Sequence, residues 1–509
     1  MIHVDTVKSW RVKGFGMSKV IEKRCVYCGT DVAKTSRIKD SSGCYYCEEC
    51  YSQIQNKHNL PKTSSDSPAS LRQPKSDSFF GSWQKRWGLR EKVICPHCWY
   101  VFPPESVLWV AQHIELLGDT VLGPEALMRF LPSRFTPQGH AIDARGSVCQ
   151  TMACPKCHLS VPRHAIEMDL LFASIIGVPS SGKSYFLTSM VWQLRQILPN
   201  QFGLSFADAD TVSNRSLNEY EETLFLAPDP DALVAIRKTE TEGELYDQIR
   251  LGEQTVHLPR PFLFSIRPLP EHLHYQQAKQ ISRVICMYDN AGEHFLPGSD
   301  NAGSMVTHHL ARSRILMFMY DPTQDPRFRQ RCLGFSKDPQ LQKDTIVSRQ
   351  EVTLTEASHR VRKSLGLSPT QKHKVPLIVI IPKYDVWASL LDVRLGDEPY
   401  IVSSSGQTHL VDTEKVEFIS NKVRHLLWNT VPDLVFAAED FCETVIYIPC
   451  SATGCSPEID ESGQIFGLRP RHLKPQWVAV PFMYALARMS IDLVFSLNQK
   501  QPNEGRSRQ

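Results

Sequence analysis

Hydrophobic and polar positions change their pattern at about residue 168 of the chain. From there on, apolar runs of eight to ten residues alternate with segments in which apolar positions recur at helical spacing. Continuous apolar runs of this length are typical of strands buried on both faces of a sheet, and strands alternating with helices predict a parallel α/β layer. We expect strands at residues 169–178, 260–268, 282–289, 313–321, 375–383 and 444–451, and a last helix over 477–497.

The first 165 residues are polar and carry several cysteine pairs. Two such regions are separated by a stretch rich in Ser, Pro and basic residues, which is the composition of a linker. The sequence predicts five parts: a zinc-ribbon module (1–60), a basic linker (61–90), a second zinc-binding module with an insertion (91–165), an α/β domain (166–498) and a disordered tail (499–509).

Composition narrows the class of protein. With 42% hydrophobic and 22% charged residues among 509, a wholly disordered, collagen-like or coiled-coil chain is excluded. No apolar stretch reaches the length of a membrane span and residues 1–19 lack a secretory signal, so we expect a cytoplasmic protein without a membrane partner. Residues 1–90 hold sixteen Lys and Arg against eight Asp and Glu, which permits contact with nucleic acid, although a solvated linker is the more common outcome.

The first cysteine set pairs Cys25-x-x-Cys28 with Cys47-x-x-Cys50 across eighteen residues. This spacing is expected of a site in which four thiolates hold a tetrahedral Zn²⁺. Cys44 offers a competing pair with Cys47 and could replace Cys50 as a ligand.

The second set consists of Cys95-Pro-His-Cys98 and Cys154-Pro-Lys-Cys157. A separation of 55 residues is long, so either an insertion lies within one four-cysteine zinc site or the pairs serve different sites. We favour one site. Nearby alternative ligands are His97, His158 and Cys149.

A phosphate-binding loop is predicted at residues 177–184. The segment GVPSSGKS matches G-x-x-x-x-G-K-[ST] at every fixed position, follows an apolar strand and precedes a helical pattern. Backbone N–H groups and the helix N-terminus would surround the phosphates, with Lys183 reaching the β- and γ-phosphates and Ser184 holding Mg²⁺. The expected nucleotide-binding residues here are Gly177, Ser180, Ser181, Gly182, Lys183, Ser184 and Tyr185.

Three further motifs follow predicted strands. Asp289-Asn-Ala-Gly292 resembles the GTPase motif in which the aspartate serves Mg²⁺ and the glycine N–H contacts the γ-phosphate. Lys383-Tyr-Asp385 resembles the guanine motif, because a carboxylate accepts the two N–H donors of guanine while Lys383 packs over the base. Ser451-Ala452 resembles the loop whose backbone N–H meets the guanine carbonyl.

Together these motifs resemble a Ras-like GTPase core of the translation-factor-related (TRAFAC) class. The departure is Pro382, where Asn or Thr is usual, which removes a side chain that normally ties this loop to the phosphate loop. The segments CPHCWYVF, GDTVLG, RFLPSRF, ACPKCHL, GVPSSGKSYFL, YDNAGEHF and DPTQDPRFR resemble the bacterial double-GTPase family, second type, over residues 91–455. That resemblance implies a Ras-like P-loop GTPase domain behind two zinc modules, and a multi-component conflict or defence-like system with GTPase-activating-like or other protein partners.

Catalytic candidates are Glu293 or His294, which would orient the attacking water beside Lys183. Thr239 is the preferred additional Mg²⁺ ligand, with Thr211 and Thr241 as alternatives. An arginine finger could come from Arg327, Arg329 or Arg331, although solvated basic residues are more common, and His308-His309 fits a loop and helix surface better than a metal site.

The sequence thus predicts a GTP-binding switch that hydrolyses GTP to GDP with Mg²⁺, slowly without a partner, and docks protein partners through two Zn²⁺ modules. One alternative is an ATPase that uses the same phosphate loop, which Pro382 favours. Another is a nucleotide-bound zinc-ribbon scaffold without useful turnover.

Overall fold

We analysed a computed structural model of the chain. It describes residues 90–236, 246–251, 254–289, 308–342, 349–403, 406, 408–459, 465–489 and 491–497, together with Val32, 37–39 and 45–48. The chain divides into two compact units, Met1–Ser76 and Asp77–Gln509. In the first unit, β1 (Arg37–Lys39) pairs antiparallel with β2 (Tyr45–Cys47).

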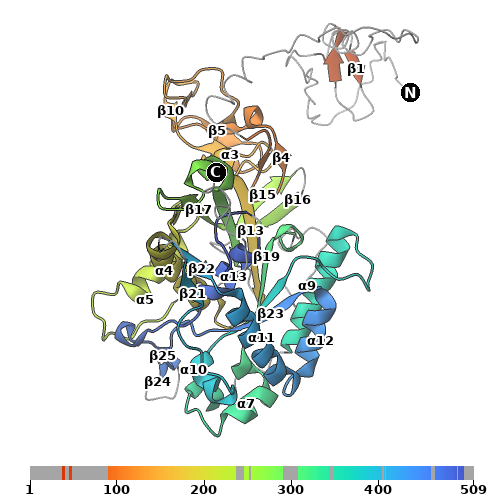
Figure 1. The fold of residues 1–509 in the computed structure, drawn as a ribbon. Helices are drawn as coiled ribbons and strands as arrows, with labels where there is room; N and C mark the ends of the chain where they lie inside the picture. The colour runs from red at the N-terminus through yellow and green to blue at the C-terminus, as the bar shows by residue number, and fades with distance from the viewer. Residues whose placement is uncertain are drawn as a thin grey trace, which may run out of the picture. The chain divides into compact units, whose positions relative to one another are not determined.

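The second unit is a mixed α/β structure built on a seven-stranded, mostly parallel sheet (Figure 1). Its strands, in spatial order, are β14 (Leu204–Asp208), β17 (Phe262–Pro268), β18 (Arg283–Asp289), β13 (Asp169–Gly177), β19 (Ile315–Met319), β20 (Leu377–Ile381) and β23 (Val445–Pro449). All six predicted strands are present. The sequence analysis missed β14, and β17 runs antiparallel to both of its neighbours.

Helices cover both faces of the sheet. In Figure 1, α9 and α12 pack against each other on one side of the sheet, and α4 lies on the other. The longer helices are α4 (Lys183–Phe202), α5 (Arg215–Phe225), α9 (Gln350–Leu365), α11 (Thr413–Trp428), α12 (Pro432–Phe441) and α13 (Val480–Arg488). The shorter elements of this region are α6 (Ala278–Ile281), α7 (Pro326–Cys332), α8 (Pro339–Gln342), α10 (Tyr384–Trp387), β21 (Tyr400–Val402), β22 (His409–Val411), β24 (Glu458–Ile459) and β25 (Ile465–Gly467).

The predicted last helix over 477–497 is wrong in its extent, because α13 ends at Arg488 and Met489 is already extended. Residues beyond it pair with β22 instead. The Val411 N–H donates to the Phe495 carbonyl at 2.9 Å, and the Leu497 N–H donates to the Val411 carbonyl at 3.1 Å. No described helix combines the length and the apolar character that a membrane span needs.

The cysteine-rich region before the sheet consists of short strands. They are β3 (Val93–Ile94), β4 (Val101–Phe102), β5 (Leu108–Val110), β6 (Leu117–Asp119), β7 (Gly123–Leu127), β8 (Arg129–Phe130), β9 (Ala141–Ile142), β10 (Val148–Cys149), β11 (Met152–Ala153) and β12 (Ser160–Val161), followed by helix α3 (His164–Glu167). A hairpin of β15 (Tyr246–Leu251) and β16 (Gln254–Pro259) completes this region. Its Ile249, Val256 and Leu258 share one buried cluster with the cysteines.

Candidate functional site

Four buried cysteines converge in the second unit, as the sequence predicts for the second cysteine set. The sulfur atoms of Cys95, Cys98, Cys154 and Cys157 all lie within 4.8 Å of one another. Cys95 Sγ is 3.7 Å from Cys157 Sγ, and Cys98 Sγ is 3.7 Å from Cys154 Sγ. A tetrahedral zinc ion with Zn–S bonds of about 2.3 Å would place its sulfurs about 3.8 Å apart. The four residues could therefore hold one zinc ion, and the 55-residue separation is an insertion within a single site.

The two halves of this site have the same backbone geometry. In the first knuckle (residues 95–99), the His97 N–H faces Cys95 Sγ at 3.4 Å and Trp99 has a φ of 56°. In the second knuckle (residues 154–158), the Lys156 N–H faces Cys154 Sγ at 3.3 Å and His158 has a φ of 60°. This left-handed residue after each pair turns the chain away from the sulfurs. Burial raises the pKa of the Cys95 thiol, so a thiolate at this position needs a bound cation to stabilise it.

The alternative ligands of this site are engaged elsewhere. His97 Nε2 bonds to the Ser160 carbonyl at 3.0 Å, and His158 Nδ1 bonds to the Asp119 carboxylate at 2.8 Å. The Cys149 thiol faces the Ser147 carbonyl at 3.7 Å. The candidate zinc ligands are therefore the four cysteines alone. Of the first cysteine set, Cys47 is described and half-buried, while Cys25, Cys28, Cys44 and Cys50 lie outside the described residues.

The loop between β13 and α4 has the close packing and the unusual backbone that a phosphate loop needs. Gly177 lies beside β19, where an added Cβ would come within 3.0 Å of the Met319 carbonyl oxygen. Ser180 and Gly182 have φ values of 60° and 92°, and α4 begins directly after them. Backbone N–H groups in such a turn, at the positive end of a helix dipole, form an anion-binding concavity.

Lys183 and Ser181 fill the interior of this loop. Lys183 Nζ donates to the carbonyls of Gly177 and Val178, each at 2.9 Å. The Ser181 hydroxyl is buried and has no hydrogen-bond partner among the described residues. The Tyr185 hydroxyl accepts the Ile236 N–H at 3.3 Å, at the start of the segment in which the switch threonine was predicted.

Asp289 ends β18 next to the phosphate loop, as the sequence predicts. Its carboxylate hydrogen-bonds with the Ser184 hydroxyl and is close enough to Lys183 to interact electrostatically. Oδ1 is buried and lacks a hydrogen-bond partner in the described part of the chain. Burial raises the pKa of Asp289 to about 6, against the opposing effects of Lys183 and Ser184. A hydroxyl and a carboxylate with an unused oxygen form a fitting ligand set for Mg²⁺.

The two loops predicted to bind guanine are joined to each other and to α4. The Ser451 hydroxyl donates to Asp385 Oδ1, and burial raises the pKa of Asp385. The Tyr384 N–H donates to the Cys450 carbonyl at 3.0 Å, and the Ser189 hydroxyl of α4 donates to the Ala452 carbonyl at 2.7 Å. The structure therefore brings the ends of β20 and β23 together at the edge where β13 and β18 also end.

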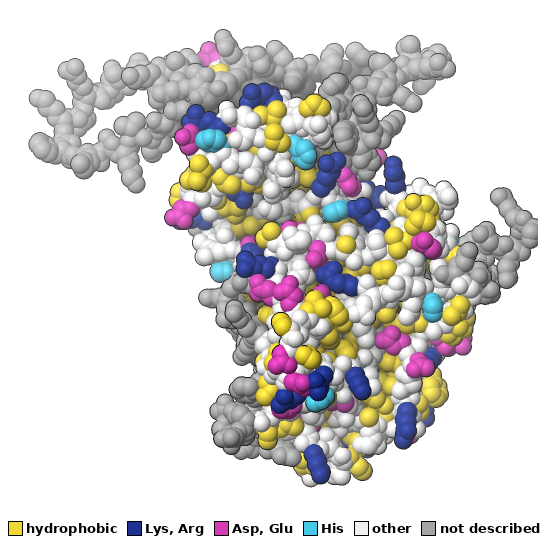
Figure 2. Space-filling model, turned by 90° about the vertical axis from the view of Figure 1, so that its left-hand side faces the viewer, with side chains coloured by type: hydrophobic (Ala, Val, Ile, Leu, Met, Phe, Trp, Pro, Cys, Tyr) yellow, Lys and Arg dark blue, Asp and Glu magenta, His cyan; other side chains and the backbone are white. Residues whose placement is uncertain are grey.

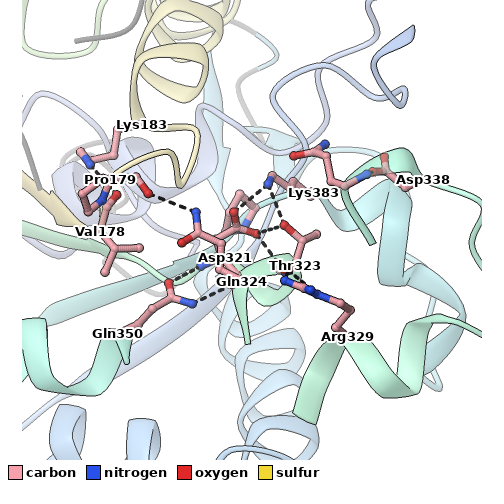
Figure 3. Close-up of polar contacts among 12 residues, drawn as sticks. Val178, Pro179, Lys183, Asp321, Thr323, Gln324, Arg329, Asp338, Gln350 and Lys383 are labelled. Atoms are coloured by element: carbon pink, nitrogen blue, oxygen red, sulfur yellow. Dashed lines mark hydrogen bonds and ion pairs between the residues drawn. The ribbon is translucent and has the colours of Figure 1, made fainter. Parts of the chain in front are cut away.

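Residues after β19 connect the phosphate loop to Lys383 (Figure 3). Gln324 Nε2 donates to the Pro179 carbonyl at 3.1 Å. Three residues earlier, the Asp321 carboxylate accepts Lys383 Nζ at 2.6 Å, and Thr323 Oγ1 accepts the same ammonium at 2.9 Å. The segment 321–324 thus ties the loop of Lys383 to the predicted phosphate loop. A side chain at position 382 normally makes this connection, and Pro382 cannot make it. The sequence analysis used this motif for the family resemblance and as a source of arginines, and did not predict that it connects the two loops.

Gln350 at the start of α9 holds this segment in place. Its side-chain amide accepts the Asp321 N–H and donates to the Asp321 carbonyl, each at 2.8 Å. Asp321 is fully buried, and Gln350 is nearly so. No sequence signal marked Gln350, because its role depends on the position of α9 against the end of β19.

The arginines of this motif have structural partners. Arg327 pairs with Asp325 at 3.0 Å and with Asp433 at 2.7 Å. Arg329 donates to the Thr323 carbonyl, and Arg331 to the Thr430 hydroxyl. These contacts occupy all three arginines within the unit.

Other predicted residues lie outside the described part of the chain, namely Gly292, Glu293, His294, Thr239 and Thr241. Thr211 is exposed in the loop before α5. The prediction that His308-His309 forms a loop and helix surface is wrong for His309, which is fully buried. The reason is its packing: the His309 ring stacks on Tyr288 at a centroid distance of 4.4 Å, and its Nδ1 bonds to the Ser174 hydroxyl.

Figure 2 shows acidic and basic side chains interspersed over one face of the described residues. This face does not present a continuous basic surface of the kind that tracks a nucleic-acid backbone.

No protein-family model matches the chain. A region of 262 residues is 23% identical to a Mycolicibacterium smegmatis (strain ATCC 700084 / mc(2)155) protein named "Putative ESX-1 scaffolding and assembly protein SaeC". The matched region is 51% of this chain and 58% of that protein, so the chain spans little more than half of the relative's length. The similarity therefore concerns only part of each protein.

Proposed function

We propose that this protein is a zinc-containing P-loop GTPase that binds Mg²⁺ and GTP or GDP and acts as a switch for protein partners. The observation that carries the proposal is the arrangement of Lys183, Ser184 and Asp289 at the carboxyl ends of β13 and β18. A buried carboxylate with an unused oxygen lies beside a hydroxyl and an ammonium group, next to a loop shaped for phosphate.

The position of this arrangement supports the proposal. From β13 the chain builds β17 and β18 on one side of the sheet and β19, β20 and β23 on the other. Such a change of direction leaves a crevice at the carboxyl ends of the strands, where α/β proteins bind their ligands. The resemblance to Ras-like and double-GTPase sequences leads to the same site.

Guanine selectivity is proposed from Asp385, Ser451 and Ala452. The Asp385 carboxylate would accept the two N–H donors of guanine, which adenine lacks, and the backbone N–H of Ala452 would meet the guanine carbonyl. During hydrolysis Mg²⁺ would polarise the phosphates, Lys183 would stabilise the developing charge, and Glu293 or His294 would orient the attacking water.

Equilibrium binding of fluorescent GDP and GTP in the presence of Mg²⁺, with ATP as competitor, tests this proposal. Wild type should bind the guanine nucleotides and resist ATP, and Asp385→Ala should lose the preference. Asp392→Ala is the matched control, because its carboxylate is exposed and pairs only with Lys422 among the described residues. If ATP displaces the fluorescent nucleotides as well as GDP and GTP do, and Asp385→Ala does not change this, an ATPase replaces the GTPase as the proposed function.

A second candidate function is that of a scaffold for a multi-protein assembly. It is favoured by the partial similarity to the protein named as an ESX-1 scaffolding and assembly protein. The double variant Glu293→Ala/His294→Ala separates the two candidates, because it removes both residues proposed to orient the attacking water. A GTPase would keep nucleotide binding and lose hydrolysis, whereas the assembly activity of a scaffold without turnover would be unaffected.

A further inference from the structure

The first knuckle is packed directly onto the sheet. Trp99, the residue after Cys98, is only 3% exposed. It lies in a small apolar cluster between the cysteine site and the sheet, which consists of Trp99, Met168, Phe172, Leu263, Val284, Cys286 and Tyr288. The left-handed conformation of Trp99 turns its side chain out of the knuckle and into this cluster. The knuckle and β18 therefore share one buried core.

Tyr288 makes the polar contacts across this junction. Its hydroxyl accepts the indole N–H of Trp99 at 3.0 Å and donates to the carbonyl of Pro96, which lies between the ligands Cys95 and Cys98. Tyr288 is fully buried. Both of its hydroxyl contacts thus come from the five residues whose conformation the four-cysteine site fixes.

Tyr288 is also the residue before Asp289. Side chains alternate along a strand, so Tyr288 faces the knuckle while Asp289 faces Ser184 and Lys183. Pairing of β18 with β17 ends at Met287, whereas pairing with β13 continues to Asp289. The last two residues of β18, Tyr288 and Asp289, are therefore not paired with β17. They are held by β13 and by the contacts that Tyr288 makes with the first knuckle.

The ring of Tyr288 is also packed against another side chain. His309 stacks on it with an interplanar angle of 13°, and Ser174 bonds to both His309 and the Ser313 hydroxyl. Ser174 is the register partner of Tyr288 in β13, the strand that leads into the phosphate loop. Tyr288 is therefore linked through His309 and Ser174 to β13 as well as to its own strand β18, and these two strands carry the proposed Mg²⁺ site.

We infer that Tyr288 is a positioning residue for Asp289, and that it couples zinc in the four-cysteine site to Mg²⁺-nucleotide at Ser184 and Asp289. The inference rests on the proposed function. Zinc would fix the first knuckle, the knuckle would fix the hydroxyl of Tyr288, and the end of β18 would then present the Asp289 carboxylate at the right distance from Ser184.

Coupling between two sites is reciprocal, and its usual range is about 5- to 150-fold in affinity. The test measures Mg²⁺-GDP affinity of the full chain, with zinc bound and after zinc removal by a thiol-reactive reagent and chelator followed by reduction. In wild type, zinc removal should weaken Mg²⁺-GDP binding about tenfold. In Tyr288→Phe, which keeps the ring and loses the hydroxyl, zinc removal should change the affinity by less than about threefold.

Tyr447→Phe is the matched control, because it removes a buried tyrosine hydroxyl from β23 that contacts Glu439 rather than the knuckle. It should show the same zinc effect as wild type. The reverse measurement guards against simple unfolding of the cysteine module. Release of zinc to a chromogenic chelator should be slowed by Mg²⁺-GDP in wild type and in Tyr447→Phe, but not in Tyr288→Phe.

The outcomes are distinct. Loss of the reciprocal effects only in Tyr288→Phe supports the coupling. Nucleotide binding that does not depend on zinc, or an equal zinc effect in all three proteins, overturns the coupling and leaves the proposed function intact. If zinc-loaded wild type fails to bind any Mg²⁺-nucleotide, the proposed function itself is overturned.

Discussion

Replacing Asp289 with Asn should stabilise the Mg²⁺-free protein while it weakens Mg²⁺-dependent nucleotide binding. The Asp289 side chain is 6% exposed, and burial raises the pKa of its carboxyl to about 6. The ionised group is therefore unfavourable in the folded protein. Asn has nearly the shape of the protonated acid and carries no charge, so it removes this cost and keeps an oxygen that can accept the Ser184 hydroxyl.

The expected magnitude follows from the difference between the folded pKa of about 6 and the unfolded value of about 3.9. The folded state binds the proton more tightly, so stability is lost as the pH rises through this window. Two pKa units correspond to about 3 kcal/mol, which is reached above about pH 6.5. At about pH 5 roughly half of this cost is present.

Urea unfolding without added Mg²⁺ measures the effect. Asp289→Asn should exceed wild type in unfolding free energy by up to about 3 kcal/mol at about pH 7.5, and by about half of that at about pH 5. Asp392→Asn is the control for loss of an exposed carboxylate. The reasoning is refuted if Asp289→Asn is no more stable than wild type, or if the difference does not decrease at the lower pH.

Three further predictions concern the loops and the cysteine site. Gln324→Ala should weaken GDP binding about fivefold through loss of one hydrogen bond to the phosphate loop, and adding Pro382→Asn should restore part of this affinity in the same binding assay. Cys154→Ser should lose the zinc of the four-cysteine site, measured by elemental analysis as one zinc fewer per chain than in wild type, and lower the unfolding midpoint, whereas Cys149→Ser should keep the wild-type zinc content. Gly182→Ala should cost about 1–2 kcal/mol of stability by thermal unfolding, because φ is 92° there, and raise the Kd for nucleotide.

Local sequence signals were sufficient for the parts of the fold that depend on local physics. Six strands of the sheet are continuous apolar runs, and each is present because a strand buried on both faces requires such a run. The four cysteines of the second set also converge as expected, since their chemistry leaves few other uses for two C-P-x-C pairs. The segment GVPSSGKS lies between a strand and a helix, β13 and α4, as predicted, because the apolar run before it and the helical pattern after it are both local signals.

What the sequence did not predict depends on contacts between distant segments. The hairpin of β15 and β16 lies about a hundred residues after the cysteine module in the sequence and packs into it. The residue pattern of the hairpin does not indicate this contact. His309 is polar and next to another histidine, which is typical of a surface, yet Tyr288 and Ser174 provide a stacking partner and a hydrogen-bond partner that make its burial possible. Gln324 and Gln350 likewise acquire their roles only when β19 ends between the phosphate loop and α9.

The position of the second cysteine module changes how its role should be understood. The sequence analysis predicts two zinc modules that dock protein partners. In the structure, the side of the first knuckle that carries Trp99 is buried against β18, and the indole N–H and the Pro96 carbonyl both bond to Tyr288. A surface that forms part of the core is not available to a partner. The module therefore supports the strand that presents Asp289, and a partner that binds the module must use its other surfaces.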